Sequence, residues 1–213
     1  HGVMNTDNMS IHGLTIDYGP YGWLEDFNPD WTPNTTDSGR KRYKFGNQAQ
    51  IGGWNYARLL ESMAPLLEQP NKLHKALDYY YESYQNYNNE MWAEKLGLDG
   101  FNTGDDILIS ELTVLLQSVE TDMTIFFRLL SSINEPDISH LTYAFYSREN
   151  IPKQEWNVWL NKWWSRVKQN PDQEKMKIAN PKYVLRNWMA QLAIDAAEGE
   201  DYSVAIELYE LLR

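Results

Sequence analysis

Two oxygen-bearing side chains near the start of the chain are of the types that can share one divalent cation. Asn8 ends the segment that runs from His1, and Asp17 opens the segment Asp17-Tyr18-Gly19 nine residues later. A carboxamide oxygen and a carboxylate are hard ligands of the kind that Mg²⁺ takes in proteins. A cation held in this way neutralises the phosphates of a nucleotide. The sequence therefore predicts that Asn8 and Asp17 bind Mg²⁺, or Mn²⁺ in its place.

Asp7 is the candidate for the residue that handles a proton. Many kinases carry the pattern His-Gly-Asp, four residues and Asn, and the Asp at its third position is the base. Here that position is Val3, which cannot take a proton, whereas Asp7 directly precedes Asn8 and could face the same phosphates. The alternative is that Asp7 and Asn8 only shape a turn, because Asp and Asn favour turn positions. His1 is expected to orient the loop.

Composition limits the classes of partner. The 213 residues are 42% hydrophobic, which is enough to form a sizeable core, and the net charge of -11 would repel a nucleic-acid backbone. No run of the sequence has the roughly 18 apolar residues that span a bilayer, and no signal peptide is recognisable at the start. The chain lacks Cys, which agrees with a reducing compartment. We expect a protein without nucleic-acid or membrane partners, cytoplasmic in a bacterium or mitochondrial in a eukaryote.

The elements that must position these residues change character along the chain. Alternating side chains predict two short strands, Val3-Met4 and Leu14-Thr15-Ile16, on either side of the candidate loop. Residues 19–46 are rich in Pro, Gly, Asn, Asp and Thr, which predicts a long irregular segment. Beyond residue 46 apolar residues recur at helical spacing almost to the end. The expected helices begin near Ile51, Asn71, Asp105, Asp122, Leu141, Trp156, Tyr183 and Val204.

The expected architecture is mainly α, with a short β element around the candidate loop. No linker or repeat divides the chain, so we predict one continuous domain, in which residues 1–46 carry the loops and residues 47–213 form the helical body. Two rows of aromatic residues are expected to be core and helix-packing material rather than a ligand platform, because aromatic rings bury large areas. They are Tyr79, Tyr80, Tyr81, Tyr84 and Tyr87, and Trp156, Trp159, Trp163 and Trp164.

Several blocks of sequence, in order from one end of the chain to the other, resemble the selenoprotein O family. They are His1 to Asn8, Asp17-Tyr18-Gly19-Pro20, Phe45-Gly46-Asn47-Gln48 with Trp54-Asn55 and Ala57-Arg58, Phe126-Phe127-Arg128, and Asn180 to Asn187. The resemblance implies a protein-kinase-like fold that binds ATP in a reversed orientation. It also implies transfer of AMP from ATP to hydroxyl-bearing side chains of proteins, with Asn8 and Asp17 on the metal and Asp7 acting on the incoming hydroxyl.

The resemblance covers only the C-terminal lobe and tail of such a protein. The sequence has no Gly-x-Gly-x-x-Gly loop and no Lys in a Val-Ala-Ile-Lys context, and in this family the groups that bind the phosphates precede the catalytic loop. The chain opens on a catalytic-type motif and stops inside a helical pattern at Leu211-Leu212-Arg213, so we expect it to be part of a longer protein that is inactive as a fragment. Two alternatives remain: a conventional kinase-like phosphotransferase, and a non-catalytic helical scaffold.

Overall fold

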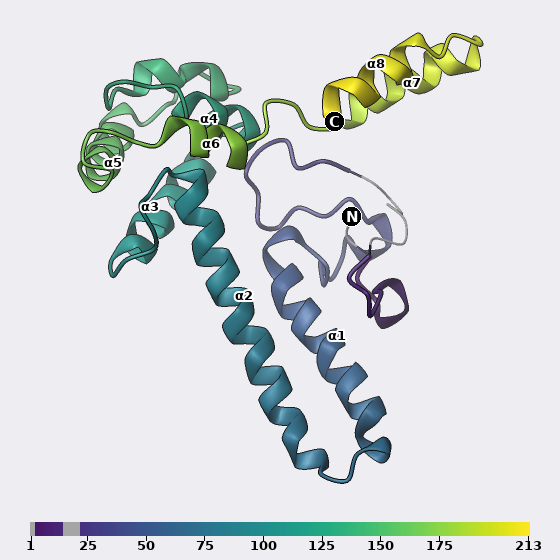
Figure 1. Ribbon diagram of the computed structural model, residues 1–213. Coiled ribbons are helices and arrows are strands. Elements are labelled where there is room, and N and C mark those ends of the chain that lie inside the picture. The colour runs from purple at the N-terminus through teal and green to yellow at the C-terminus, as the bar shows by residue number, and fades with distance from the viewer. Residues whose placement is uncertain (1–2, 15–21) are drawn as a thin grey trace. The chain divides into compact units, whose positions relative to one another are not determined.

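The computed structural model describes residues 3–14 and 22–213, which group into two compact units. The first consists of His1–Trp23 and Asn28–Asn88, and the second of Leu24–Phe27 and Asn89–Arg213. Eight α-helices account for most of the described chain (Figure 1). They are α1 (Gln48–Met63), α2 (Leu73–Lys95), α3 (Asp105–Ser118), α4 (Met123–Leu130), α5 (Lys153–Arg166), α6 (Gln173–Ala179), α7 (Asn187–Glu198) and α8 (Ser203–Leu212). Six short 3-10 helices are η1 (Thr6–Asn8), η2 (Thr35–Asp37), η3 (Phe45–Asn47), η4 (Ala64–Leu66), η5 (Pro70–Lys72) and η6 (Ile138–Ala144).

The mainly α prediction is confirmed, whereas the expected strands are not seen in the described residues. Val3 and Met4 lie outside any strand, as does Leu14, and Thr15 and Ile16 fall outside the described residues. The helix predicted from Leu141 is instead the 3-10 helix η6. Helix α6 was missed, because at seven residues it is too short to show a clear period.

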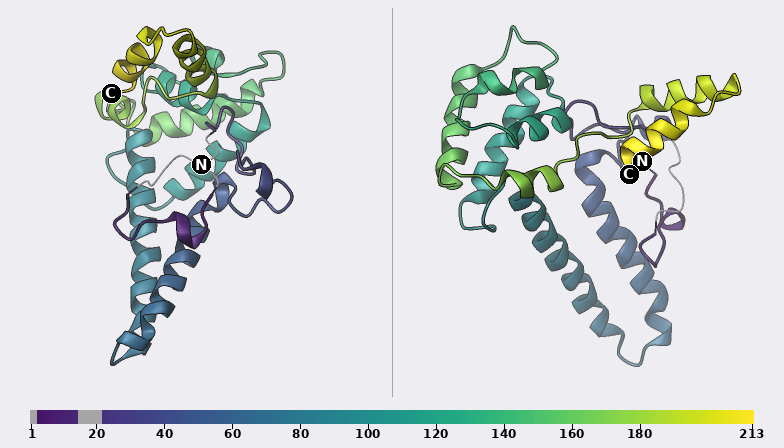
Figure 2. Two further views of the ribbon diagram at one scale, coloured as in Figure 1. Left: turned by 90° about the vertical axis from the view of Figure 1, so that its right-hand side faces the viewer. Right: turned by 45° about the horizontal axis from the view of Figure 1, so that its top comes forward.

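Helix α7 begins at Asn187 rather than at Tyr183, because a tertiary contact holds the preceding residue extended. Arg186 has φ −84° and ψ 149°, and its guanidinium pairs with Asp122 at 2.8 Å and with Glu25. Helices α7 and α8 then pack against each other as a hairpin, with Asp201 accepting from the backbone N–H of Ser203 at 2.9 Å in the turn (Figure 2). A helical N–H that lacks a backbone partner is satisfied in this way.

Helices α1 and α2 of the first unit form an antiparallel pair, in which tyrosine side chains of α2 reach two glycines of α1 (Figures 1 and 2). A Cβ on Gly52 would lie 2.6 Å from the Tyr80 hydroxyl oxygen, and one on Gly53 would lie 2.6 Å from that of Tyr81. The Tyr80 hydroxyl also donates to the carbonyl of Ala49 at 2.9 Å. A glycine has no side chain, so these two positions leave room beside α1 for the tyrosine hydroxyl groups of α2.

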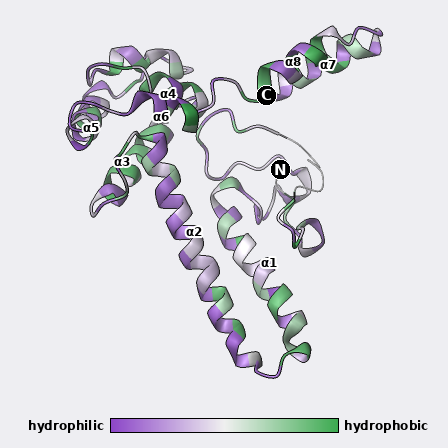
Figure 3. Ribbon diagram, in the orientation of Figure 1, coloured by the Kyte–Doolittle hydropathy of each residue, from purple (hydrophilic) through white to green (hydrophobic). Residues whose placement is uncertain are grey.

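The tyrosine row of α2 corrects the expectation of a core, because most of it faces solvent, although Tyr80 and Tyr81 do pack against α1. The exposed fractions are 70% for Tyr79, 47% for Tyr81, 43% for Tyr84 and 71% for Tyr87. Helix α2 is hydrophilic along much of its length (Figure 3). A tyrosine ring with its polar edge can remain in contact with water, so an aromatic row alone does not establish burial.

The tryptophan row, by contrast, is the centre of the second unit, as predicted. Trp156, Trp159 and Trp163 on α5 are at most 1% exposed, and the rings of Trp159 and Trp163 stack with centroids 6.3 Å apart. The Trp159 indole N–H donates to the carbonyl of Leu108 at 2.8 Å, and that of Trp163 donates to Leu96 at 2.8 Å. These bonds satisfy polar groups that would otherwise be buried unpaired, and they fix α5 against α3 and the end of α2.

Two motifs that carry the family resemblance, Phe126-Phe127-Arg128 and the block that starts at Asn180, contact each other in the second unit. Lys95, at the end of α2, donates to the Asn180 side-chain oxygen at 2.8 Å and lies 4.4 Å from the centroid of the Phe127 ring. Arg128 donates to the backbone carbonyls of Lys177 and Asn180 at 2.9 and 3.1 Å. The contacts join α2, α4 and α6, which the sequence separates widely. Burial lowers the pKa of the Lys95 ammonium to about 8.

The lowered pKa of Lys95 predicts that the second unit becomes more stable as pH rises from neutral. Below about pH 8 the ammonium is charged in both states, and the folded protein bears its desolvation cost. Between about pH 8 and the unfolded value of 10.5 the unfolded chain binds the extra proton, so the free energy of unfolding rises with pH. We expect a gain of about 2 kcal/mol from pH 7 to pH 9.5 in urea denaturation.

A Lys95→Met variant is the control, because the remaining titrating groups are unchanged in it. The wild-type gain should be absent from this variant, and equal pH slopes in the two proteins would contradict the assignment. The measurement stops at pH 9.5 because burial raises the pKa of Tyr146 to about 12. Because the pKa of Tyr146 is higher in the folded protein, this residue lowers the free energy of unfolding as pH rises above the unfolded value near 10. That decrease would oppose the effect of the lysine.

Among the described residues, no helix combines the length and apolar character needed to cross a membrane.

Candidate active site

The candidate loop is a single tight turn. Thr6, Asp7 and Asn8 form η1, which the backbone closes by a hydrogen bond from the N–H of Asn8 to the carbonyl of Asn5 at 3.0 Å. Asp7 is exposed and Asn8 is half-buried. The turn that the sequence offered as an alternative is therefore present, and it presents the Asp7 side chain to solvent. A turn and a catalytic loop are compatible, because functional residues are often carried by loops on a rigid scaffold.

The side chain of Asn55, on α1, anchors this turn to the helix. Its side-chain nitrogen donates to the backbone carbonyl of Met4 at 2.8 Å and lies 2.7 Å from the sulfur of Met9. The two contacts bracket η1, one before it and one after it. Asn55 is 6% exposed, so its hydrogen bond is shielded from competing water. The loop is therefore held against α1 by these contacts.

A second anchor comes from the irregular segment before α1. The Tyr43 hydroxyl donates to the side-chain oxygen of Asn5. Asp37, which is 8% exposed, holds that tyrosine in place, because its two carboxylate oxygens accept from the backbone N–H groups of Arg42 at 2.9 Å and Tyr43 at 2.7 Å. The segment predicted to be irregular is thus ordered by side-chain contacts, and it supports the loop.

The candidate side chains of the turn, Asp7 and Asn8, form none of these anchoring contacts. Neither the Asp7 carboxylate nor the Asn8 carboxamide takes part in a hydrogen bond or ion pair within residues 3–14 and 22–213. Asp17, the other predicted ligand, lies outside the described residues. Within the described ranges no group of three His, Asp or Glu side chains could hold a metal ion. An amide oxygen and a carboxylate nevertheless fit the oxygen preference of Mg²⁺, which keeps several waters when bound.

A cavity of about 690 Å³ opens between this loop and α1. Thr6, Met9 and Ser10 contribute from the loop side, and Asn55 and Arg58 from α1. The Arg58 guanidinium lies 5.3 Å from the centroid of the Trp54 ring and pairs with Glu61 at 2.5 Å. One wall of the cavity is therefore the turn that carries Asp7.

Removing the Asn55 anchor should loosen the turn without unfolding α1. In Asn55→Leu the side chain keeps its volume but cannot donate to Met4, and a hydrogen bond contributes about 0.5–1.5 kcal/mol. We expect amide hydrogen exchange of residues 4–9 to accelerate roughly 2- to 10-fold, while the amides of α1 keep their protection. Asn86→Leu, on an exposed position of α2, is the matched control. Unchanged exchange of residues 4–9 would mean that Asn55 does not hold the turn.

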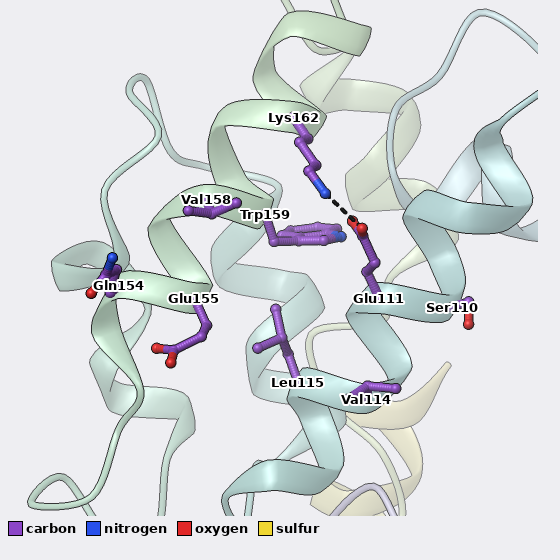
Figure 4. Close-up of a pocket in the computed structure, with 9 residues that line it drawn as sticks. All are labelled: Ser110, Glu111, Val114, Leu115, Gln154, Glu155, Val158, Trp159 and Lys162. Atoms are coloured by element: carbon purple, nitrogen blue, oxygen red, sulfur yellow. Dashed lines mark hydrogen bonds and ion pairs between the residues drawn. The ribbon is translucent and has the colours of Figure 1, made fainter.

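Two of the hollows in the second unit contain cationic side chains that could be compared with this loop. One groove of about 480 Å³ lies between α3 and α5, where Lys162 and Glu111 pair at 2.6 Å beside the edge of Trp159 (Figure 4). The other, of about 610 Å³, is lined by Tyr146 and by Arg186 with its two carboxylate partners, Glu25 and Asp122. In both, the described cations are already paired with carboxylates, whereas Asp7 and Asn8 are unengaged. The loop of the first unit is therefore the stronger candidate.

Sequence reasoning did not assign roles to Asn55 and Tyr43. Asn55 stands within the apolar pattern of α1, next to Trp54 in a block that carries the family resemblance. A polar residue on the buried face of a helix needs a partner, and this signal could have marked it. No signal in the sequence would have paired Tyr43 with Asn5, because they are 38 residues apart.

Comparison with known proteins defines the class. The chain matches the family described as protein adenylyltransferase SelO over residues 1–213, and it belongs to that family. It is 49% identical to the protein nucleotidyltransferase YdiU of Flavobacterium johnsoniae and 48% identical to that of Aromatoleum aromaticum. Identity to the protein of the same name from Rhodopirellula baltica is 44%. Each match covers 100% of this chain but only 42–44% of the relative, so the chain spans less than half the length of these relatives.

Proposed function

We propose that a protein of the relatives' full length containing this chain transfers AMP from ATP to Ser, Thr or Tyr hydroxyls of other proteins. In this proposal Asp7 acts on the incoming hydroxyl, and Asn8 and Asp17 hold the metal. Membership of the adenylyltransferase family supports the reaction class. The observation that carries the site is an anchored turn whose Asp7 and Asn8 side chains are unengaged. The helical portion described here would be the C-terminal lobe of a kinase-like fold.

The chain's own residues supply position and a proton acceptor. The acceptor hydroxyl oxygen forms a bond to the α-phosphorus of ATP as the bond to pyrophosphate breaks, and the hydroxyl proton passes to the exposed Asp7 carboxylate. Asn55 and Tyr43 hold the turn from two sides, so Asp7 needs little reorganisation during the reaction. Asn8 and Asp17 offer the oxygen ligands for a divalent ion, which when bound neutralises the phosphates.

We also propose that residues 1–213 alone transfer no AMP. The sequence contains neither a Gly-x-Gly-x-x-Gly loop nor a Lys in a Val-Ala-Ile-Lys context, and groups of that kind hold nucleotide phosphates in kinase-like sites. To test this, the chain and its purified full-length counterpart are incubated separately with labelled ATP. Label incorporated by the chain alone, and lost in Asp17→Ala, would show that the proposal is wrong.

Intact-mass spectrometry of the full-length protein after incubation with ATP and Mg²⁺ tests the reaction itself. A mass increase of one AMP supports adenylyl transfer, whereas an increase of one phosphate would identify a conventional kinase. A scaffold would give neither product, and its nucleotide and Mg²⁺ binding would be equal in wild type and Asp17→Ala. Repeating the incubation with Mn²⁺ shows which ion the site prefers.

A further inference from the structure

Asn55, which lines the cavity beside the candidate turn, has an unsatisfied polar atom. Asn55 is 6% exposed, and its side-chain oxygen has no hydrogen-bond partner among the described residues. The orientation of the amide is fixed, because the backbone carbonyl of Met4 can only accept and so must face the nitrogen at 2.8 Å. Buried polar atoms without a partner are rare in native proteins, and each calls for an explanation. A hydrogen-bond donor that enters from outside would satisfy this oxygen.

The other walls indicate what kind of donor the cavity would accept. Met9 and Leu59 are apolar, Ser10 offers a hydroxyl, and Arg58 is the one charged residue among the described residues that line the cavity. Its guanidinium is already paired with Glu61, which leaves little positive charge for a nucleotide's phosphates. Mostly apolar walls with a few convergent polar groups are typical of a ligand site. A peptide, with apolar side chains and backbone N–H groups, fits these walls better than a nucleotide does.

The cavity also lies next to Asp7, as a site for the acceptor peptide should. Thr6, which lines it, directly precedes Asp7 in η1. We propose that the cavity binds a segment of the acceptor protein, with the Asn55 side-chain oxygen accepting one of its N–H groups, so that the neighbouring hydroxyl reaches Asp7. This inference rests on the proposed adenylyl transfer and adds the place at which the protein substrate binds.

Filling the cavity from α1 tests the proposal. Ser62 lines the cavity, is exposed, and bonds only to its own helix, through the Leu59 carbonyl at 2.7 Å. A Ser62→Trp substitution should therefore occupy the cavity while α1 stays folded. Asn86→Trp adds the same side chain at an exposed position of α2 away from the cavity and serves as the matched control. Ser62→Leu provides a second variant with a smaller side chain, and circular dichroism confirms that each variant is folded.

The assay uses the full-length protein, ATP and a pool of capped nonapeptides with a central Ser, Thr or Tyr. We expect Ser62→Trp to raise the KM for peptide at least 10-fold and Ser62→Leu to raise it less, with the KM for ATP unchanged in both. Such a split assigns the lost interaction to the peptide rather than to the nucleotide. Asn86→Trp should match wild type in both values.

Three results would overturn the inference. They are an unchanged peptide KM in folded Ser62→Trp, a raised KM for ATP in that variant, and a wild type that adds AMP to itself but to no peptide of the pool. Failure of the proposed function looks different, because the wild type would then add AMP to neither itself nor any peptide. The two failures are therefore distinguishable in one experiment.

Discussion

Replacing Asp7 by Asn in the full-length protein should lower the rate of AMP transfer by about 10²–10⁴-fold, the usual contribution of a positioned acid–base group. The substitution keeps the size of the side chain and removes its negative charge and its capacity to take a proton. Because the Asp7 carboxylate has no hydrogen bond or ion pair within the described residues, the variant should fold as the wild type does. The loss should appear in kcat, while the KM for ATP changes little.

Asp78→Asn provides the matched control. Asp78 is an exposed carboxylate on α2 in the same unit, so its replacement changes the net charge equally without touching the loop. Asp17→Ala completes the comparison, because loss of a metal ligand should weaken the binding of ATP with Mg²⁺, whereas Asp7→Asn should preserve it. Rates within twofold of wild type in Asp7→Asn would show that Asp7 only shapes the turn.

Replacing Asp105 by Ala should reduce the free energy of unfolding of the second unit by about 3 kcal/mol, because it leaves a partly buried arginine without its main, buried partner. Asp105 is 3% exposed and accepts from two nitrogens of the Arg166 guanidinium, at 2.7 and 2.9 Å. One of its oxygens also accepts from the backbone N–H of Asn102 at 2.7 Å. The pair joins the start of α3 to the last turn of α5, and its hydrogen bonds raise the pKa of Arg166 above its ordinary value.

The expected loss is at the lower end of the range for broken buried pairs, because Arg166 keeps its contact with Asp99 at 2.7 Å. Asp99 is itself 60% exposed, so Asp99→Ala is the control and should have a small effect. Urea denaturation followed by tryptophan fluorescence measures the difference, since Trp156, Trp159 and Trp163 are buried in this unit. Equal losses in Asp99→Ala and Asp105→Ala would show that burial of the pair is not decisive.

Local sequence patterns determined most of the helices and the identity of the candidate site residues. Helix α4 begins after Asp122, as predicted, because the carboxylate accepts from the backbone N–H of Ile125 at 2.9 Å. Helix α5 follows Pro152, and its tryptophans recur at helical spacing on the buried face. Asp7 and Asn8 are candidates by residue type, and their roles are what the resemblance to the selenoprotein O family implies. The helix boundaries are local properties, so neighbouring residues in the sequence are sufficient to specify them.

Only the tertiary structure decided which side chains hold the site and which aromatic row is buried. The Asn55 anchor joins residues 51 positions apart, and the pair between Arg166 and Asp105 joins residues 61 positions apart. Periodicity carries no information about such partners. The tyrosine and tryptophan rows look alike in sequence, yet one faces water and the other fills a core, because burial depends on what packs opposite each helix face.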